Sequence, residues 1–225
     1  MRSTRRTDDS IDTALQDYVE RHILPRYDHF DPAHRRDHAL TVIRNSLGLA
    51  GHYDVDRNMV YAIAAYHDTG LAEGRERHHL VSGRIIRSDA CLRQWFDERQ
   101  INTMAEAAED HRASSDHEPR SIYGKIVAEA DRDIEPLTII RRTVQYGRSH
   151  CPDLDREQQW LRTLEHLHQK YADGGYLKLW IPESPNALQL ERLRAIIRDE
   201  ARLRSIFEEM YSQPWAGTPF RLPET

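Results

Sequence analysis

Six polar side chains that can bind a metal ion interrupt segments that are otherwise apolar. His67 and Asp68 stand side by side at the end of an apolar run that begins at Met59. The other four also lie close to apolar residues at helical spacing, and they are His38, His79, His111 and Asp131. An ionisable group on an apolar face is costly to bury unless it finds partners. A shared cation would satisfy all six at once.

The spacing of apolar neighbours places these side chains on the inward faces of expected helices. Val42 follows His38 by four residues and shares its face of a helix, and Asp131 follows Val127 by the same interval. His111 completes a helical stripe of small and apolar residues. Polar groups from separate helices are therefore expected to converge.

Two adjacent histidines, His78 and His79, compete for one of these positions. We favour His79 because Gly83 follows it by one helical turn and allows a close approach of the backbone. His78 stays open as the alternative.

Imidazole nitrogens together with carboxylate oxygens suit borderline transition metals rather than Ca²⁺. We expect a divalent cation, Mn, Fe, Co, Ni or Zn, and leave open whether one ion or two are bound. Taken alone, His67 and Asp68 have an ordinary explanation, since a histidine complements the dipole at the end of a helix and an aspartate starts a turn. Their favoured role as ligands depends on the other four side chains.

The elements that must position these residues are helices. Apolar residues recur at intervals of three and four and hardly ever alternate, which predicts an all-α fold. The chain is long enough for one core, so we expect a single domain over residues 1–225, with a C-terminal helical extension over about 153–213. The expected helices lie near residues 10–25, 33–51, 56–68, 76–88, 91–98, 100–112, 120–131, 135–147, 155–172, 186–196 and 199–211.

Composition excludes several classes of protein. Charged residues make up 31% of the chain, hydrophobic residues 39%, and the mean hydropathy is −0.78, so we expect no membrane span. The net charge of −5 is mixed along the chain, which argues against generic nucleic-acid binding. The start of the chain has no apolar segment typical of a secretory signal, and Cys91 and Cys151 have no paired spacing. These features favour a cytoplasmic protein with reduced cysteines.

The order His38, then His67-Asp68, then Asp131 resembles the H…HD…D signature of HD-superfamily phosphohydrolases. The resemblance covers most of a core over about residues 25–145 and includes the segments DPAHRRDHALTVI, RERHHLVSGRIIRSD, EDHRAS and IYGKIVAEADRDIEP. It implies an HD-domain helical bundle, similar to an uncharacterised bacterial branch, with its metal held between helices.

His79 and His111 match the two additional histidines of the binuclear branch, which includes the HD-GYP phosphodiesterases. The chain departs from HD-GYP proteins in having Leu71 where their motif has a lysine, and in lacking the GYP triplet. These departures argue against hydrolysis of a cyclic dinucleotide.

The resemblance implies metal-assisted hydrolysis of a phosphomonoester or phosphodiester in a small phosphorylated metabolite or a nucleotide. Asp68 would bridge two metal positions. His38, His67 and Asp131 would complete one position, and His79 and His111 the other. For the charge of the phosphoryl group we favour Lys125 and Arg112 among the nearby basic side chains.

Two other functions stay open at this stage. A mixed-valence di-iron oxygenase of HD type would use the same ligands for a reaction with O₂. A non-catalytic HD module that senses a ligand would be expected to have lost ligands, whereas this chain retains all of them. The substrate, the metal and the oligomeric state do not follow from the sequence.

Overall fold

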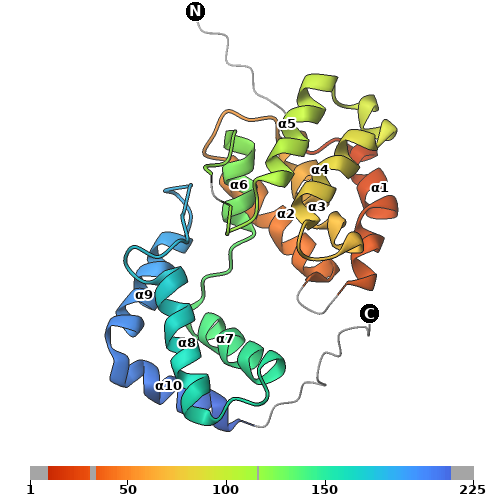
Figure 1. Ribbon diagram of the computed structural model, residues 1–225. Coiled ribbons are helices and arrows are strands. Elements are labelled where there is room, and N and C mark those ends of the chain that lie inside the picture. The colour runs from red at the N-terminus through yellow and green to blue at the C-terminus, as the bar shows by residue number, and fades with distance from the viewer. Residues whose placement is uncertain (1–9, 31–33, 116, 214–225) are drawn as a thin grey trace, which may run out of the picture. The chain divides into compact units, whose positions relative to one another are not determined.

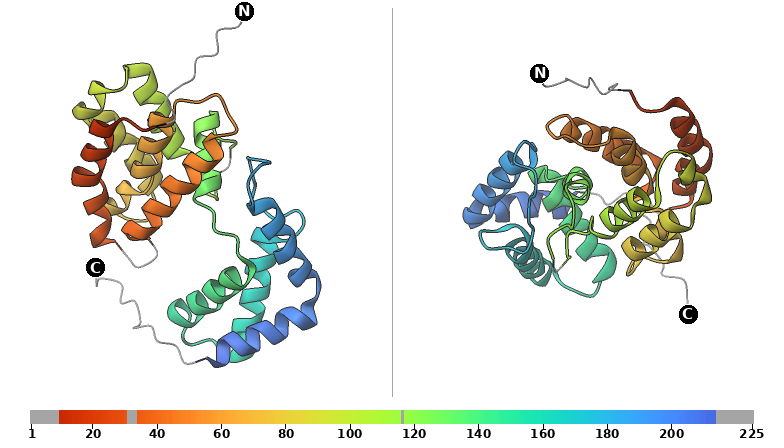
Figure 2. Two further views of the ribbon diagram at one scale, coloured as in Figure 1. Left: turned by 180° about the vertical axis from the view of Figure 1, so that it is seen from behind. Right: turned by 90° about the horizontal axis from the view of Figure 1, so that it is seen from above.

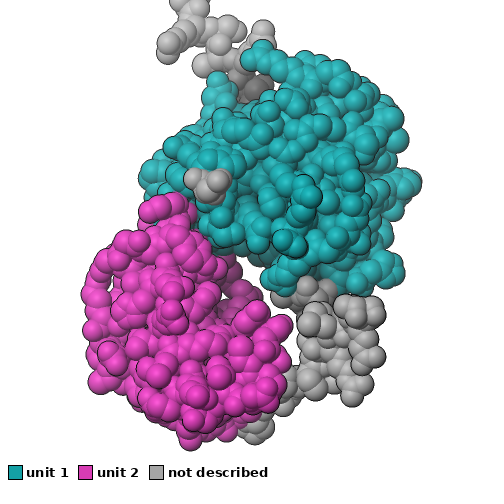
Figure 3. Space-filling model, in the orientation of Figure 1, with its two compact units in different colours: residues 1–132, 179–184 teal, residues 133–178, 185–225 magenta. Residues whose placement is uncertain are grey.

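A computed structural model describes residues 10–30, 34–115 and 117–213 (Figure 1). Every regular element in these ranges is helical, which confirms the predicted all-α fold. The chain divides into two compact units (Figure 3): unit 1 comprises residues 1–132 and 179–184, and unit 2 comprises residues 133–178 and 185–225. The single-domain organisation stays a prediction, because it concerns cooperative folding rather than shape.

Unit 1 surrounds a helix that is buried over all but its first two residues. Residues 59–66 of that helix, α3, are all buried, and α3 packs against α1, α2, α4, α5 and α6 (Figures 1 and 2). The α-helices of unit 1 are α1 (Thr13–His22), α2 (Arg36–Ala50), α3 (Arg57–Tyr66), α4 (His78–Ser88), α5 (Glu98–Glu109) and α6 (Ile122–Ala130). Short 3₁₀ turns join them: η1 (Leu24–His29), η3 (Thr69–Glu73) and η4 (Ala90–Gln94).

Local sequence explains where these helices begin. The carboxylate of Asp56 accepts hydrogen bonds from the first N–H groups of α3, and Ser121 does the same for α6. Asp97 and Gln100 form a capping box at the start of α5. This cap corrects one expectation: the helix expected over 91–98 is only the 3₁₀ turn η4, because the chain must leave helical geometry before Asp97 to start α5.

A short non-helical segment completes unit 1, although it lies far along the chain. Residues 179–184 follow the first part of unit 2 and belong to unit 1. Ile181 is 2% exposed within the core of unit 1, and Trp180 packs against that core. The core beside the metal-binding residues is therefore closed by residues that come from well beyond residue 145.

Unit 2 consists of α7 (Pro136–His150), α8 (Arg156–Tyr171), α9 (Asn186–Arg198) and α10 (Glu200–Ser212). Asp155 and Gln158 form a capping box at the start of α8, and Gly174 ends the following turn with φ near +81°, a value that glycine adopts without strain. The buried apolar side chains of this unit include Ile140, Val144, Trp160, Leu167, Leu193 and Phe207. None of the described helices is both long enough and apolar enough to cross a bilayer.

Candidate metal centre

The ends of five helices meet in unit 1, and the polar side chains gather there. His67 and Asp68 directly follow α3, His111 comes just after α5, and Asp131 is the first residue after α6. His38 lies within α2, and His78 is the first residue of α4. The side chains of two groups lie close enough to share an ion: His38, His67 and Asp68, and Asp68, His78 and His111.

Three of the imidazole rings are held by the same kind of hydrogen bond. The Nδ1 atoms of His67, His78 and His111 lie 2.7, 2.7 and 2.6 Å from the carbonyl oxygens three residues earlier in the chain. A carbonyl oxygen can only accept, so Nδ1 carries the proton in each ring. Each Nε2 is therefore turned toward the cluster, as metal-binding histidines require.

Asp68 divides its two carboxylate oxygens between two pairs of histidines. Its Oδ2 atom lies 3.4 Å from Nε2 of His67 and 3.7 Å from Nε2 of His38. Its Oδ1 atom lies 3.3 Å from Nε2 of His78 and 3.4 Å from Nε2 of His111. One carboxylate thus faces two adjacent sets of donors, which is the arrangement expected of a bridging ligand.

Asp131 completes the first set of donors. Its Oδ1 atom lies 3.1 Å from Nε2 of His38 and 3.7 Å from Nε2 of His67. The side chains of Asp131 and His38 are 26% and 24% exposed, whereas that of Asp68 is 5% exposed and that of His67 is fully buried. The cluster is therefore open to solvent on the side of His38 and Asp131.

The electrostatics of the cluster show strong coupling between its acids and imidazoles. Burial alone would lower the pKa of His38, but hydrogen bonds to Asp131 and Asp68 raise it to about 10. Burial would raise the pKa of Asp131, but His38 and the neighbouring histidines lower it to about 2. Burial and the nearby His111 lower the pKa of His78 to about 4. The two carboxylates therefore stay ionised and offer negative charge to any cation.

The donor set fits a divalent transition metal. Nε2 of His38 and His67 lie 3.3 Å apart, and Nε2 of His78 and His111 lie 3.2 Å apart. Two neutral imidazoles with lone pairs facing each other at this distance would repel, so each pair requires a proton or a cation between them. Together with two carboxylates, the nitrogen donors are those that Mn, Fe, Co, Ni and Zn accept. His38, His67, Asp68 and Asp131 would hold one ion, and Asp68, His78 and His111 a second.

The structure brings together five of the six predicted ligands, with His78 in place of His79. His79 belongs to neither donor group, and its Nδ1 atom is buried without a hydrogen-bond partner. The spacing to Gly83 was misleading, because a Cβ at Gly83 would lie 2.9 Å from a carbonyl oxygen of α5, so that glycine serves the packing of α4 on α5. The close approach that positions His78 is made by Gly70 instead.

Gly70 lets the turn after α3 touch the first turn of α4. A Cβ at Gly70 would lie 2.0 Å from the carbonyl oxygen of His78 and 2.7 Å from the nitrogen of Ser82. The N–H group of Gly70 donates to the Ser82 hydroxyl over 3.0 Å. These contacts fix His78 relative to Asp68, and sequence spacing alone could not reveal them.

Tyr27, which was not predicted to belong to the site, holds the His67-Asp68 turn through hydrogen bonds of its hydroxyl. Its hydroxyl donates to the carbonyl oxygen of Ala65 over 2.9 Å and accepts the N–H of Asp68 over 3.3 Å. The side chain is fully buried in η1. A lone tyrosine in a short turn carries no sequence signal for this role.

The two basic residues expected to bind phosphate do not contact the cluster. In the described part of the chain, Lys125 forms an ion pair with Glu118, and Arg112 donates to the carbonyl oxygen of Glu76 over 2.8 Å. Among the described residues, neither is shown in a hydrogen bond or ion pair with the metal-binding side chains. Their catalytic roles, like the ligand roles of the cluster residues, stay predictions.

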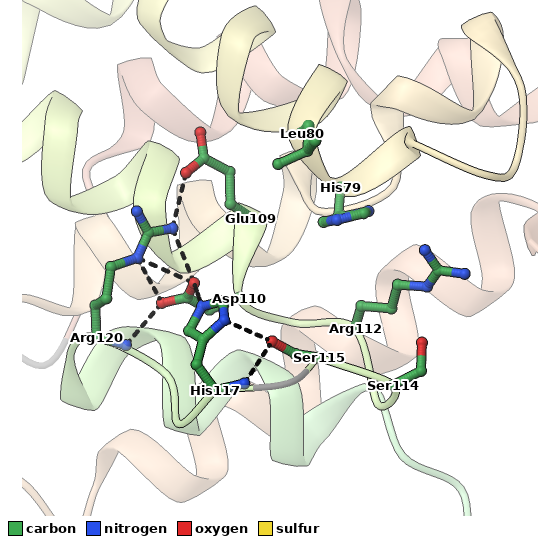
Figure 4. A pocket seen from close by; sticks show the side chains of 9 residues that line it. All are labelled: His79, Leu80, Glu109, Asp110, Arg112, Ser114, Ser115, His117 and Arg120. Carbon is green, nitrogen blue, oxygen red and sulfur yellow. Dashed lines mark hydrogen bonds and ion pairs between the residues drawn. The ribbon is translucent and has the colours of Figure 1, made fainter.

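Arg112 lines a polar pocket of about 480 Å³ between the start of α4 and the loop that follows α5 (Figure 4). Arg120 donates to both carboxylate oxygens of Asp110 and to Glu109, so the two acids of this pocket are neutralised. The lining residues are His79, Leu80, Glu109, Asp110, Arg112, Ser114, Ser115, His117 and Arg120. Asp110 precedes His111, so the hydrogen bonds from Arg120 hold the residue next to the cluster.

Comparison with known proteins identifies one family. Residues 35–134 match the family model described as the HD domain, and this range contains every residue of the cluster. No curated protein and no solved structure matches the chain.

Proposed function

Residues 35–134 of this chain form an HD domain, and on this premise we propose that the protein is a metal-dependent phosphohydrolase. Its substrate would be a small phosphorylated metabolite or a nucleotide, cleaved at a phosphomonoester or phosphodiester bond, and we retain the cytoplasmic location expected from the sequence as part of the proposal. The observation that carries the proposal is the shared carboxylate of Asp68, with each oxygen facing its own pair of histidines.

The cluster supplies what phosphoryl hydrolysis needs. Bound metal ions lower the pKa of a water molecule and offset charge on the phosphoryl oxygens. Asp68 and Asp131 stay ionised and would bind the positive ions, and the site opens to solvent where His38 and Asp131 lie. The buried His67 and His111 exclude water from the inner side. A phosphate ester would therefore approach over His38 and Asp131.

Basic groups outside the cluster would contribute to binding of the substrate. We retain Arg112 as a candidate, because it lies next to His111 and donates through Nη1 to the carbonyl oxygen of Glu76, at the edge of the cluster. Lys125 is a weaker candidate, since its ammonium group is paired with Glu118.

The test is a panel of phosphomonoesters, phosphodiesters and nucleotides, assayed with Mn²⁺ and Co²⁺ after elemental analysis of the purified protein. We expect release of phosphate from at least one substrate and a loss on the order of a hundredfold or more in Asp68→Ala, because several kcal/mol of charge stabilisation depend on the ions it holds. Glu165→Gln, an exposed change in α8, is the matched control and should retain full activity.

Two results would contradict the proposal. Undiminished hydrolysis in Asp68→Ala would show that the reaction takes place elsewhere. A purified protein that contains iron, hydrolyses none of the panel and consumes O₂ would establish the oxygenase instead.

A further inference from the structure

Glu129 is a buried acid that lies beside the metal centre and is not one of its ligands. Glu129 is fully buried in the last turn of α6, two residues before Asp131. An ionised carboxylate in such a place is costly unless its partners are fixed. Its partners therefore indicate what the residue does.

The first partner comes from the segment of unit 1 that lies far along the chain. The backbone N–H of Trp180 donates to Oε2 of Glu129 over 2.8 Å. This segment is itself anchored just after Trp180: Ile181 is buried in the core, and the hydroxyl of Tyr53 donates to Oε2 of Glu183 over 2.6 Å. The donor that holds Glu129 is thus part of a fixed strap, residues 179–184.

The second partner is the residue that follows Asp131. The Nη1 atom of Arg132 lies 3.5 Å from Oε2 of Glu129, and the Arg132 side chain is only 7% exposed. Neither Nε nor Nη1 of Arg132 has a hydrogen-bond acceptor. Glu129 is therefore the counter-charge that keeps this buried guanidinium in place.

The end of α6 is also tied to the helix that carries His38. The side-chain amide of Asn45, in α2, donates to the carbonyl oxygen of Ala130 over 3.4 Å. The 3.1 Å separation between His38 and Asp131 consequently depends on how firmly the last turn of α6 is held.

We propose that Glu129 is a positioning residue for the metal centre. Its carboxylate accepts the Trp180 N–H group and pairs with Arg132, the residue after Asp131. These contacts hold the backbone around Asp131 in place. The Asp131 carboxylate is thereby directed at His38. The strap of residues 179–184 is the part of the chain that completes this support. The inference depends on metal binding by the cluster and not on the reaction that the metal serves.

The experiment is a titration of the metal-free full chain with Co²⁺, followed by the visible absorption of the bound ion. Glu129→Leu combined with Arg132→Met removes the ion pair without leaving one buried charge alone, so this variant is expected to fold. We expect the affinity of the site that includes Asp131 to fall by about tenfold or more, in the range typical of residues that orient ligands. The affinity of the site formed by His78 and His111 should stay unchanged.

Matched variants separate the two contacts. Glu129→Gln combined with Arg132→Met keeps an oxygen that accepts from Trp180, and it should retain most of the Co²⁺ affinity that the first double variant loses. Trp180→Pro removes the N–H donor and should weaken the same site, whereas Trp180→Ala keeps the donor and should not. Circular dichroism of each variant checks that it is folded.

Three outcomes would overturn the inference: equal Co²⁺ affinity in the wild type and the double variant, an equal loss at both sites, or no Co²⁺ binding by the wild type. Wild-type protein that binds Co²⁺ but hydrolyses no phosphate ester would contradict only the proposed function.

Discussion

At the start of α4, two adjacent histidines with the same chemistry have different surroundings. Successive residues of a helix point about 100° apart. His78 therefore faces Asp68 and His111, while His79 lines the polar pocket on the other side of the helix. The sequence could establish that one of them belongs to the cluster, but the choice depends on which face of α4 meets the end of α3.

Substitution of each histidine tests this assignment. We expect the wild type to bind two divalent ions, His78→Ala to bind one, and His79→Ala to bind two, because only His78 has its Nε2 atom beside Asp68. Elemental analysis after dialysis against Mn²⁺ or Co²⁺ measures the stoichiometry. Loss of one ion in His79→Ala but not in His78→Ala would show that His79 is the metal ligand.

At the scale of elements, the turn after α3 can contact the start of α4 because Gly70 has no side chain. Gly70→Ala should lower the free energy of unfolding by about 1–3 kcal/mol, since its Cβ would collide with backbone atoms of α4. Gly48→Ala, within α2 and with no atom within 4 Å of the added Cβ, should raise it by about 0.5–1 kcal/mol. Urea unfolding of both variants compares them directly, and equal effects would refute the argument.

Asp89, at the end of α4, accepts hydrogen bonds from the hydroxyl of Tyr18 in α1 over 2.8 and 3.0 Å, and from that of Tyr66 in α3 over 2.5 Å. Burial and the adjacent Asp89 raise the pKa of Tyr18. A pKa raised in the folded state stabilises the fold below the unfolded value, about 10 for tyrosine, and that contribution is lost as the pH rises above it.

Tyr18→Phe should therefore lower the free energy of unfolding by about 1 kcal/mol at pH 7, the typical contribution of a hydrogen bond. The difference from the wild type should shrink as the pH rises above about 10. Urea unfolding from pH 7 to pH 11 measures both effects. A difference that is constant with pH would show that Tyr18 acts through packing alone.

Most of the elements could be predicted, and their exceptions have local causes. Apolar periodicity together with caps such as Asp56 and Asp155 marks the helices well. The full helix predicted around Cys91 was wrong. Asp89 and Asp97 lie within nine residues, and each caps the start of a new element. Of the cluster, His38, His67, Asp68, His111 and Asp131 could be identified from the apolar faces that carry them.

At the scale of the whole molecule, unit 1 is discontinuous in sequence. Ile181→Ala in the strap should lower the free energy of unfolding of unit 1 by about 2–5 kcal/mol, as for other fully buried isoleucines. Leu188→Ala, at a side chain that is 59% exposed, is the control and should change it by less than about 0.5 kcal/mol. Hydrogen exchange of the amides of α3 reports on unit 1 alone, and unchanged protection in Ile181→Ala would contradict a structural role for the strap.

This part of the architecture could not be predicted from the sequence. The stretch Leu179-Trp180-Ile181 resembles any short apolar segment after a turn, and nothing in its residue types says which core it joins. The role of Glu129 could not be predicted for the same reason. Arg132 is three positions away, but Trp180 is 51 positions away, and only folding brings it to Glu129. Contacts between distant segments leave no periodic pattern in a chain.

The carbonyl tethers that hold His67, His78 and His111 have a consequence for how the protein acquires its metal. Each ring is held by a backbone oxygen with its Nε2 turned inward, so ion binding costs little side-chain freedom. Because Nδ1 keeps its proton in all three rings, an incoming ion can displace protons only from the Nε2 side. Uptake of metal should therefore release protons into the medium and weaken in acid.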